Sequence, residues 1–128
     1  RTFFVGSSGE EERHVYDVVR RALEAGQNAV RPGIAASQVD RAARRVIEEA
    51  GYGDYFNHRL GHGLGMAIHE APDIKGGNEE ILQEGMVFTV EPSILLPGRF
   101  CVHLENTVRV TSQGWESLNS LRFDPQIL

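Results

Sequence analysis

Five side chains that can bind a metal ion or move a proton gather in two parts of the chain. His58, His62 and His69 lie within twelve residues of one another, and Glu91 and Glu105 follow downstream. Imidazole and carboxylate groups are ligands of the divalent ions that catalyse hydrolysis. Glycines surround the histidines, and glycine lets a backbone approach a bound ion or substrate closely. The set therefore predicts a hydrolytic metal site.

The two glutamates are expected on a β-hairpin. Residues 86–90 and 100–110 are predicted strands on either side of Pro97-Gly98, and an antiparallel pair is the simplest arrangement. Glu91 and Glu105 are equidistant from Gly98, so an odd-length loop places them opposite each other, whereas a two-residue turn shifts the register by one. Even positions are apolar and odd positions polar, which predicts one core face and one polar face.

Opposed carboxylates at a separation of ~5 Å are unfavourable without compensation. A bridging divalent ion, a shared proton or full hydration would each relieve the repulsion between Glu91 and Glu105. The hairpin alone therefore leaves two readings open, a metal site and a solvated sheet face.

Two helices are predicted before the histidines. The first follows a capping-box spacing at Ser8–Glu11 and runs to about Asn28. The second is capped by Ser37 and ends near Gly51. The charges on their outer faces are interpreted as solvated surface. Residues 3–6 are expected to end a strand, and residues 52–80 to form an irregular loop that carries function.

Size and composition limit the class of protein. The 128 residues, of which 41% are hydrophobic, suit one domain with a modest core. A net charge of −5 argues against nucleic-acid binding, and no apolar run approaches the ~20 residues of a membrane span. The single cysteine, Cys101, excludes an internal disulfide and indicates a reducing, cytoplasmic location. We interpret it as a core or site-wall residue.

Segments 58–65, 69–72, 89–92 and 102–106 together resemble the pita-bread metallopeptidases. That family includes methionine aminopeptidase, Xaa-Pro aminopeptidase and Xaa-Pro dipeptidase (prolidase), with creatinase as a metal-free relative. The His-Arg-x-Gly-His-Gly-x-Gly spelling is more similar to the prolidase branch. The implied fold is α/β, a curved antiparallel sheet with helices on its convex face.

The resemblance also implies a missing part. Arg1-Thr2 match the end of a family strand, Asp-x-Thr-Arg-Thr, so both metal-binding aspartates would lie upstream of residue 1. Residues 1–128 are therefore expected to be a single incomplete catalytic domain, truncated on its N-terminal side. The expected partners are a peptide substrate and either a second copy of the chain or a complementary N-terminal part.

The family roles carry over to individual residues. The implied metal ligands are His62, Glu91 and Glu105. Glu91 is also the implied acid/base group, and His69 the residue that stabilises the oxyanion. His58, His69 and His103 are the implied substrate-binding residues, although a loop histidine bonded to backbone is the open alternative for His58. The ions are Mn, Co, Zn or Fe, two in the complete site and at most one here.

The chain departs from the proline-specific pattern next to its second glutamate. Cys101, His103 and Asn106 stand where those members have glycine, arginine and aspartate. Without the arginine, His103 either replaces it in part or marks a different substrate.

The expected function is metal-dependent hydrolysis of Xaa-Pro dipeptides, or removal of a residue before proline, with weak or no activity in the isolated chain. The alternatives are a non-catalytic binding module of the same fold and a metal-free creatinase-like hydrolase.

Overall fold

The computed structural model describes residues 1–128 and has a mixed α/β architecture. Two helices come first, α1 (Glu10–Ala29) and α2 (Ala36–Glu49), followed by the short 3-10 helix η1 (Gly53–Tyr55). The strands are β1 (Gly61–Gly63), β2 (Glu70–Ile74), β3 (Val87–Val90), β4 (Ser93–Leu96), β5 (Phe100–His103), β6 (Asn106–Thr111) and β7 (Gly114–Ser117).

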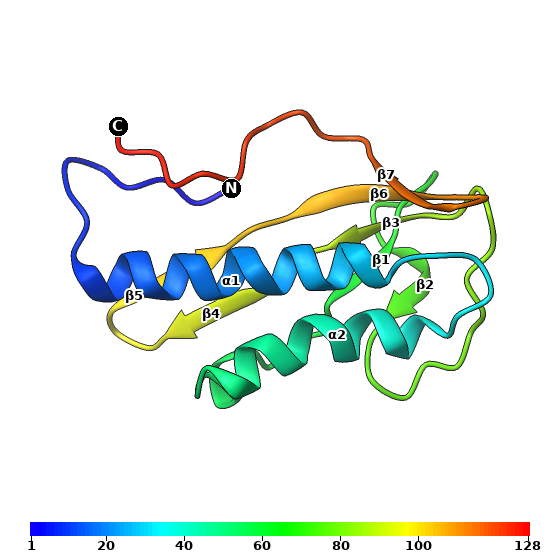
Figure 1. Cartoon of the computed structure of the whole chain (residues 1–128), viewed down its shortest axis with the longest axis horizontal. Coiled ribbons are helices and arrows are strands. Elements are labelled where there is room, and N and C mark those ends of the chain that lie inside the picture. Colours follow the sequence, from blue (N-terminus) through cyan, green and yellow to red (C-terminus); the bar gives the residue numbers. More distant parts are fainter.

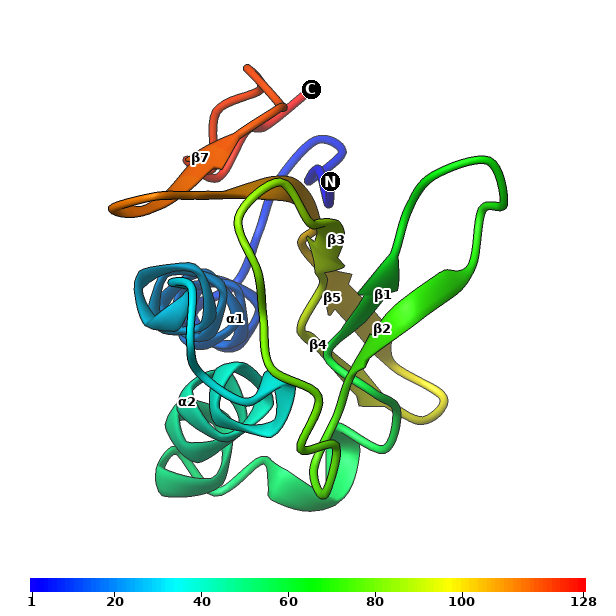
Figure 2. The same cartoon turned by 90° about the vertical axis from the view of Figure 1, so that its right-hand side faces the viewer.

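The strands form an antiparallel sheet with both helices on one side. Five strands are ordered β2-β1-β3-β6-β7, and β4 pairs with β5 in a two-stranded extension. The two helices run side by side (Figure 1), and the side view shows them together on one side of the strands (Figure 2). This arrangement confirms the predicted α/β fold class.

The helices form where the apolar periodicity predicts them. In α1 the side chains of Val15, Val18, Val19 and Leu23 are fully buried, and in α2 those of Val39, Ala43 and Ile47 are. These stripes pack against the apolar face of the sheet in one cluster of 25 buried residues. One side of every long element thus contributes to the core, as expected for amphipathic helices on a half-buried sheet.

The hairpin has the predicted register. Pairs from Leu96↔Phe100 out to Val87↔Arg109 are all centred on Gly98, so the connecting loop is the three residues 97–99. The even positions Phe88, Val90, Val102, Leu104 and Val108 are buried, as the alternation predicts. The predicted second strand, however, divides into β5 and β6.

Pro92 explains why the hairpin divides. Proline has no N–H to donate to a sheet ladder, so pairing is interrupted beside it. The N–H of Leu104 still reaches the Pro92 carbonyl at 3.3 Å, while the N–H of Glu91 donates to Leu60 at 2.8 Å. The interruption therefore falls where Glu91 and Glu105 lie, between the two pairs of strands.

The helix caps differ from the prediction. α1 begins after Gly9 with no side-chain cap, and the Ser8 hydroxyl accepts a hydrogen bond from Arg13 at 2.8 Å instead. Three glutamates in its first turn provide the charge that favours a helix N-terminus. Ser37 lies inside α2, where its hydroxyl donates to Glu79 at 2.9 Å. The predicted caps at Ser8 and Ser37 are therefore wrong.

One helix charge is buried rather than solvated. Asp40 is 2% exposed and accepts two hydrogen bonds of 2.9 Å from Arg44, one turn further along α2. Arg44 also donates to the carbonyls of Phe56 (2.8 Å) and His58 (2.9 Å), and its guanidinium stacks on the Phe56 ring. The pair therefore joins α2 to the loop that precedes β1.

Two further expectations need correction. Residues 52–80 are not wholly irregular, because they contain η1, β1 and β2. Their strands lack the apolar alternation that identifies a strand, since β1 is Gly-His-Gly. Residues 3–6 contribute only a single bridge between Phe4 and Ile127, which brings the two ends of the chain together.

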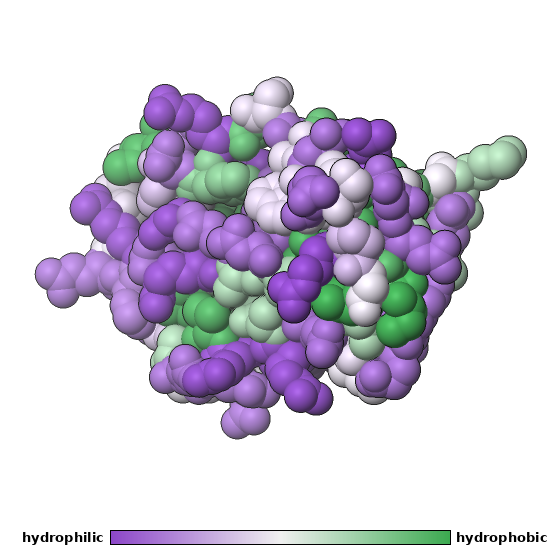
Figure 3. Space-filling view, turned by 45° about the vertical axis from the view of Figure 1, so that its right-hand side comes forward, coloured by the Kyte–Doolittle hydropathy of each residue, from purple (hydrophilic) through white to green (hydrophobic).

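Polar side chains cover much of one face of the molecule. Hydrophilic side chains cover much of the face in Figure 3, with small separate hydrophobic patches between them. Cys101 is exposed on β5 and is therefore not a core residue. Neither helix combines the length and apolarity needed to cross a membrane.

Candidate metal centre

The glycines of β1 allow His62 to approach β3. A Cβ on Gly61 would lie 1.8 Å from the Thr89 carbonyl oxygen, and one on Gly63 would lie 2.0 Å from the Ala71 oxygen. No other residue fits at either position, because such distances are far inside van der Waals contact. These two glycines thus serve contact between strands, rather than the close approach to an ion or substrate that we expected.

His62 presents one ring nitrogen to Glu91. Its Nδ1 lies 3.0 Å from the Gly63 carbonyl, which can only accept, so Nδ1 carries a proton. Its Nε2 lies 3.2 Å from Oε1 of Glu91. Histidine ligands of metals commonly donate one N–H to a carbonyl and offer the other nitrogen to the ion. The buried His62 has this arrangement.

Glu91 lies among polar contacts at the end of β3. Burial alone would raise the pKa of its carboxyl group, but the nearby imidazole of His103, the hydrogen bond from Thr89 and the charge of His62 together hold that pKa below its ordinary value. The carboxylate is therefore ionised at neutral pH and available to a cation.

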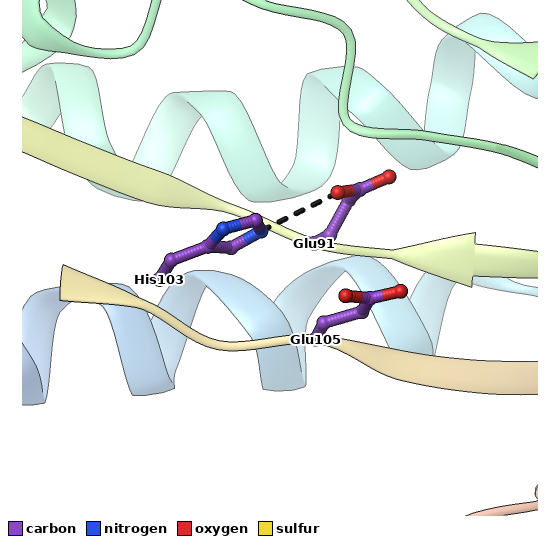
Figure 4. A group of neighbouring side chains, drawn as sticks. All are labelled: Glu91, His103 and Glu105. Atoms are coloured by element: carbon purple, nitrogen blue, oxygen red, sulfur yellow. Dashed lines mark ion pairs between the residues drawn. The ribbon is translucent and has the colours of Figure 1, made fainter. Parts of the chain in front are cut away.

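Glu91, His103 and Glu105 form a compact group of possible ligands. One ligand atom of each lies within 4.8 Å of the other two. Figure 4 shows the two carboxylates on neighbouring segments between strands, with the His103 ring directed at Glu91. His62 lies outside this group but contacts Glu91 from its other side. The predicted ligands thus all lie near Glu91, and His103, which we expected to bind substrate, lies among them.

The remaining two histidines border this group. The His69 ring lies edge-on to the His62 ring, with 4.3 Å between centroids, and is exposed in the loop between β1 and β2. The His58 ring lies 6.0 Å from that of His103. Both His58 ring nitrogens have partners at 2.6 Å, the Arg59 carbonyl and the Ser93 hydroxyl. These contacts match the alternative that we kept for His58, a loop residue bonded to backbone.

Two threonines that we did not predict support the site. The Thr89 hydroxyl donates to Glu91 at 2.9 Å and accepts the His62 N–H at 3.0 Å. The Thr2 hydroxyl accepts the His103 N–H and donates to the His103 carbonyl, both at 2.9 Å. Thr89 could have been found, because it lies two residues before Glu91 and strand side chains two apart share a face. Thr2 gives no such local signal.

The donor set suits a divalent cation. Carboxylate oxygens and imidazole nitrogens together are typical ligands of Mn, Fe, Co and Zn. The Nε2 of His103 is buried and has no hydrogen-bond partner, although it lies 3.3 Å from a Glu91 oxygen. A buried polar atom left without a partner commonly marks the place of an ion or a water. The residues present therefore fit the metal that their chemistry implies.

Comparisons with known proteins agree on one family. The model of metallopeptidase family M24 matches residues 1–112. An Xaa-Pro dipeptidase of Lactobacillus delbrueckii subsp. lactis is 45% identical over 116 residues, 91% of this chain and 32% of the relative.

Two crystal structures have the same fold. A recombinant prolidase from Thermococcus sibiricus superposes with a TM-score of 0.98 at 44% identity, over 100% of this chain and 35% of the other. Dipeptidase PepE from Mycobacterium ulcerans gives 0.97 at 42% identity, over 99% and 34%. The predicted pita-bread architecture is confirmed, and the chain spans about a third of the length of these proteins.

Proposed function

The chain belongs to metallopeptidase family M24, and on this premise we propose that it supplies the metal-binding part of a peptidase that hydrolyses Xaa-Pro dipeptides or removes a residue before proline. The observation that carries the proposal is the position of Glu91, which contacts His62 through one oxygen and His103 through the other, with Glu105 beside it. The substrate class is supported by relatives named as Xaa-Pro dipeptidases.

We assign the ligand role to His62, Glu91 and Glu105. A divalent ion held there would lower the pKa of a bound water and polarise the scissile carbonyl. Mn, Co, Zn and Fe all suit these ligands. The Thr89 hydroxyl bonds both the Glu91 carboxylate and the His62 backbone N–H, which supports the proposal that these two ligands act together.

Two residues take the proton-transfer and oxyanion roles in this proposal. Glu91 accepts a proton from the attacking water, because its lowered pKa keeps the carboxylate ionised. His69 donates to the developing oxyanion, since it is exposed beside the buried His62 and can meet a substrate carbonyl.

Polar and charged side chains line a cavity beside His69 that could accept a short peptide. A cavity of about 530 Å³ is lined by Arg59, His69, Glu70, Asp73 and Lys75, among others. We propose that the charged termini of a short peptide interact with these side chains. We propose His58 and His103 as further substrate-binding residues outside this cavity, with His58 held in place by Ser93.

The test is a hybrid enzyme in which this chain replaces the matching third of the Thermococcus sibiricus prolidase. That enzyme supplies the complementary N-terminal part, and the close superposition makes the junction feasible. We expect the hybrid to bind metal and to hydrolyse an Xaa-Pro dipeptide faster than the matched Xaa-Ala dipeptide. The isolated chain should hydrolyse both weakly or not at all.

Variants of the hybrid separate the assigned roles. His62→Ala should lose metal and activity together. His69→Ala should keep its metal and lose kcat by roughly 10²- to 10³-fold, the effect of removing one oxyanion donor. His14→Ala, far from the site on α1, is the control. A folded hybrid that holds its metal but cleaves no peptide would favour the non-catalytic binding module instead.

A further inference from the structure

We propose that His103 is a metal ligand, so that Glu91, His103 and Glu105 hold a divalent cation with a preference for zinc over manganese. This inference rests on the proposed function and adds to it a second imidazole, opposite His62. One ligand atom from each of the three residues lies within 4.8 Å of the other two, so small movements of the side chains would let them share one ion.

The orientation of the His103 ring supports this role. The side chain is 43% exposed, yet its Nε2 is buried and directed at the carboxylates. That nitrogen lies 3.3 Å from Oε2 of Glu91 without forming a hydrogen bond. The ring therefore turns its exposed edge to solvent and its potential donor atom inward, where a buried polar atom needs a partner.

The backbone of His103 is held in place, which fixes the position from which its side chain extends toward Glu91. Its N–H and carbonyl are both bonded to the Thr2 hydroxyl at 2.9 Å. The residue also pairs with Ser93 across the β4–β5 ladder. A ligand on a fixed strand end loses little freedom when an ion binds, which favours binding.

The chemistry of the donors sets the preference among metals. The group of Glu91, His103 and Glu105 offers one imidazole and two carboxylates, while His62 contacts the other oxygen of Glu91. Imidazole suits zinc, copper, iron and nickel, whereas magnesium and calcium prefer oxygen ligands alone. Exchanging His103 for a side chain with an amide oxygen should therefore weaken zinc binding more than manganese binding.

A simple ion pair between His103 and Glu91 makes the opposite prediction. In that case the imidazole competes with the metal for the carboxylate. Its removal would then free Glu91 and leave the zinc affinity unchanged or higher. The sign of the change in affinity separates the two roles.

The experiment measures Zn²⁺ and Mn²⁺ binding to the chain by calorimetry in the wild type and in His103→Gln, with His14→Ala as control. Loss of an outer contact to a metal ligand typically costs 10- to 100-fold in affinity, so we expect His103→Gln to lower zinc affinity by at least about 10-fold. The loss for manganese should be smaller, and His14→Ala should bind both metals as the wild type does.

A second measurement on the wild type needs no folded variant. Nitrogen-15 NMR of labelled histidine should show the His103 Nε2 resonance shifting with one equivalent of Zn²⁺, while the His14 resonances stay in place. A signal that does not move overturns the ligand role, even if the variant binds more weakly. Unchanged zinc affinity in His103→Gln overturns it as well.

The His62→Ala variant separates failure of this inference from failure of the proposed function. If it loses zinc while His103→Gln does not, the metallopeptidase proposal stands and only the role of His103 falls. If the wild-type chain binds neither metal, the inference about His103 falls, and metal binding and hydrolysis by the hybrid enzyme decide the proposed function.

Discussion

The Thr89 hydroxyl donates a hydrogen bond of 2.9 Å to Oε1 of Glu91, and the hydroxyl oxygen of Thr89 accepts the backbone N–H of His62 at 3.0 Å. One buried hydroxyl thus connects β1 to the residue that follows β3. The position of His62 relative to Glu91 depends on this connection, because the two come from segments that are far apart in sequence.

Thr89→Val should weaken metal binding without disrupting the strand. Valine has the shape of threonine and suits a strand, but it cannot orient the Glu91 carboxylate. We expect zinc affinity to fall by about 10- to 100-fold, as for other losses of outer contacts. Titration calorimetry measures the zinc affinity of the variant and of the wild type. Thr107→Val, directly opposite on β6, is the matched control because its hydroxyl makes no hydrogen bond. Equal losses in both variants would argue against the role of Thr89.

Gly61→Ala should destabilise the fold strongly. The added Cβ would lie 1.8 Å from the Thr89 carbonyl oxygen, so β1 must move away from β3. We expect a loss of about 2–3 kcal/mol in the free energy of unfolding, measured in urea. Gly76→Ala is the control, since a Cβ there meets only the Asp40 carboxylate, at 3.8 Å. It should stay within about 0.5 kcal/mol of the wild type.

Asp40→Asn should cost about 3 kcal/mol of stability, because it leaves the Arg44 guanidinium partly buried without its charged partner. The exposed pair of Arg45 and Glu49 lies on the same helix with the same spacing, so Glu49→Gln should change the stability far less. Chemical denaturation measures the free energy of unfolding of the Asp40→Asn and Glu49→Gln variants. Similar values would mean that the burial of Asp40 does not matter energetically.

Asp17 should contribute stability that is lost in acid. The hydrogen bond from Arg20, opposed by slight burial and helped by the charges of Arg20 and Arg21, lowers the pKa of its carboxyl group. A carboxyl with a lowered folded-state pKa stabilises the fold above its unfolded pKa, and that gain disappears as pH falls through the folded value. The pair is half exposed, so Asp17→Asn should cost only about 0.5 kcal/mol at pH 7. Thermal melts should show that the difference in stability between Asp17→Asn and the wild type vanishes in strong acid.

The hairpin could be predicted because its information is local. The alternation of apolar residues and the turn at Gly98 set the register without any contact from elsewhere in the chain. The helices follow from their apolar stripes for the same reason. The helix caps could not be predicted in the same way, because the Ser37 hydroxyl donates a hydrogen bond to Glu79, which lies far along the chain.

The parts of the site that were missed depend on distant contacts. β1 forms because glycines let its backbone come close to its neighbours, and no side-chain periodicity records that. Thr2 and His103 meet across almost the whole chain length. The burial of Asp40 likewise depends on a loop that follows its helix.

The three-residue loop at residues 97–99 has a consequence for how this family can vary. Paired residues in the two arms are equidistant from Gly98. If a one-residue deletion or insertion in the loop slid the arms by one step, Leu104 or Asn106 would lie opposite Glu91 in place of Glu105. Changes of two residues would keep odd positions facing odd ones. Homologues that retain the chemistry should therefore differ in the length of this loop only by even numbers, unless a bulge elsewhere restores the count.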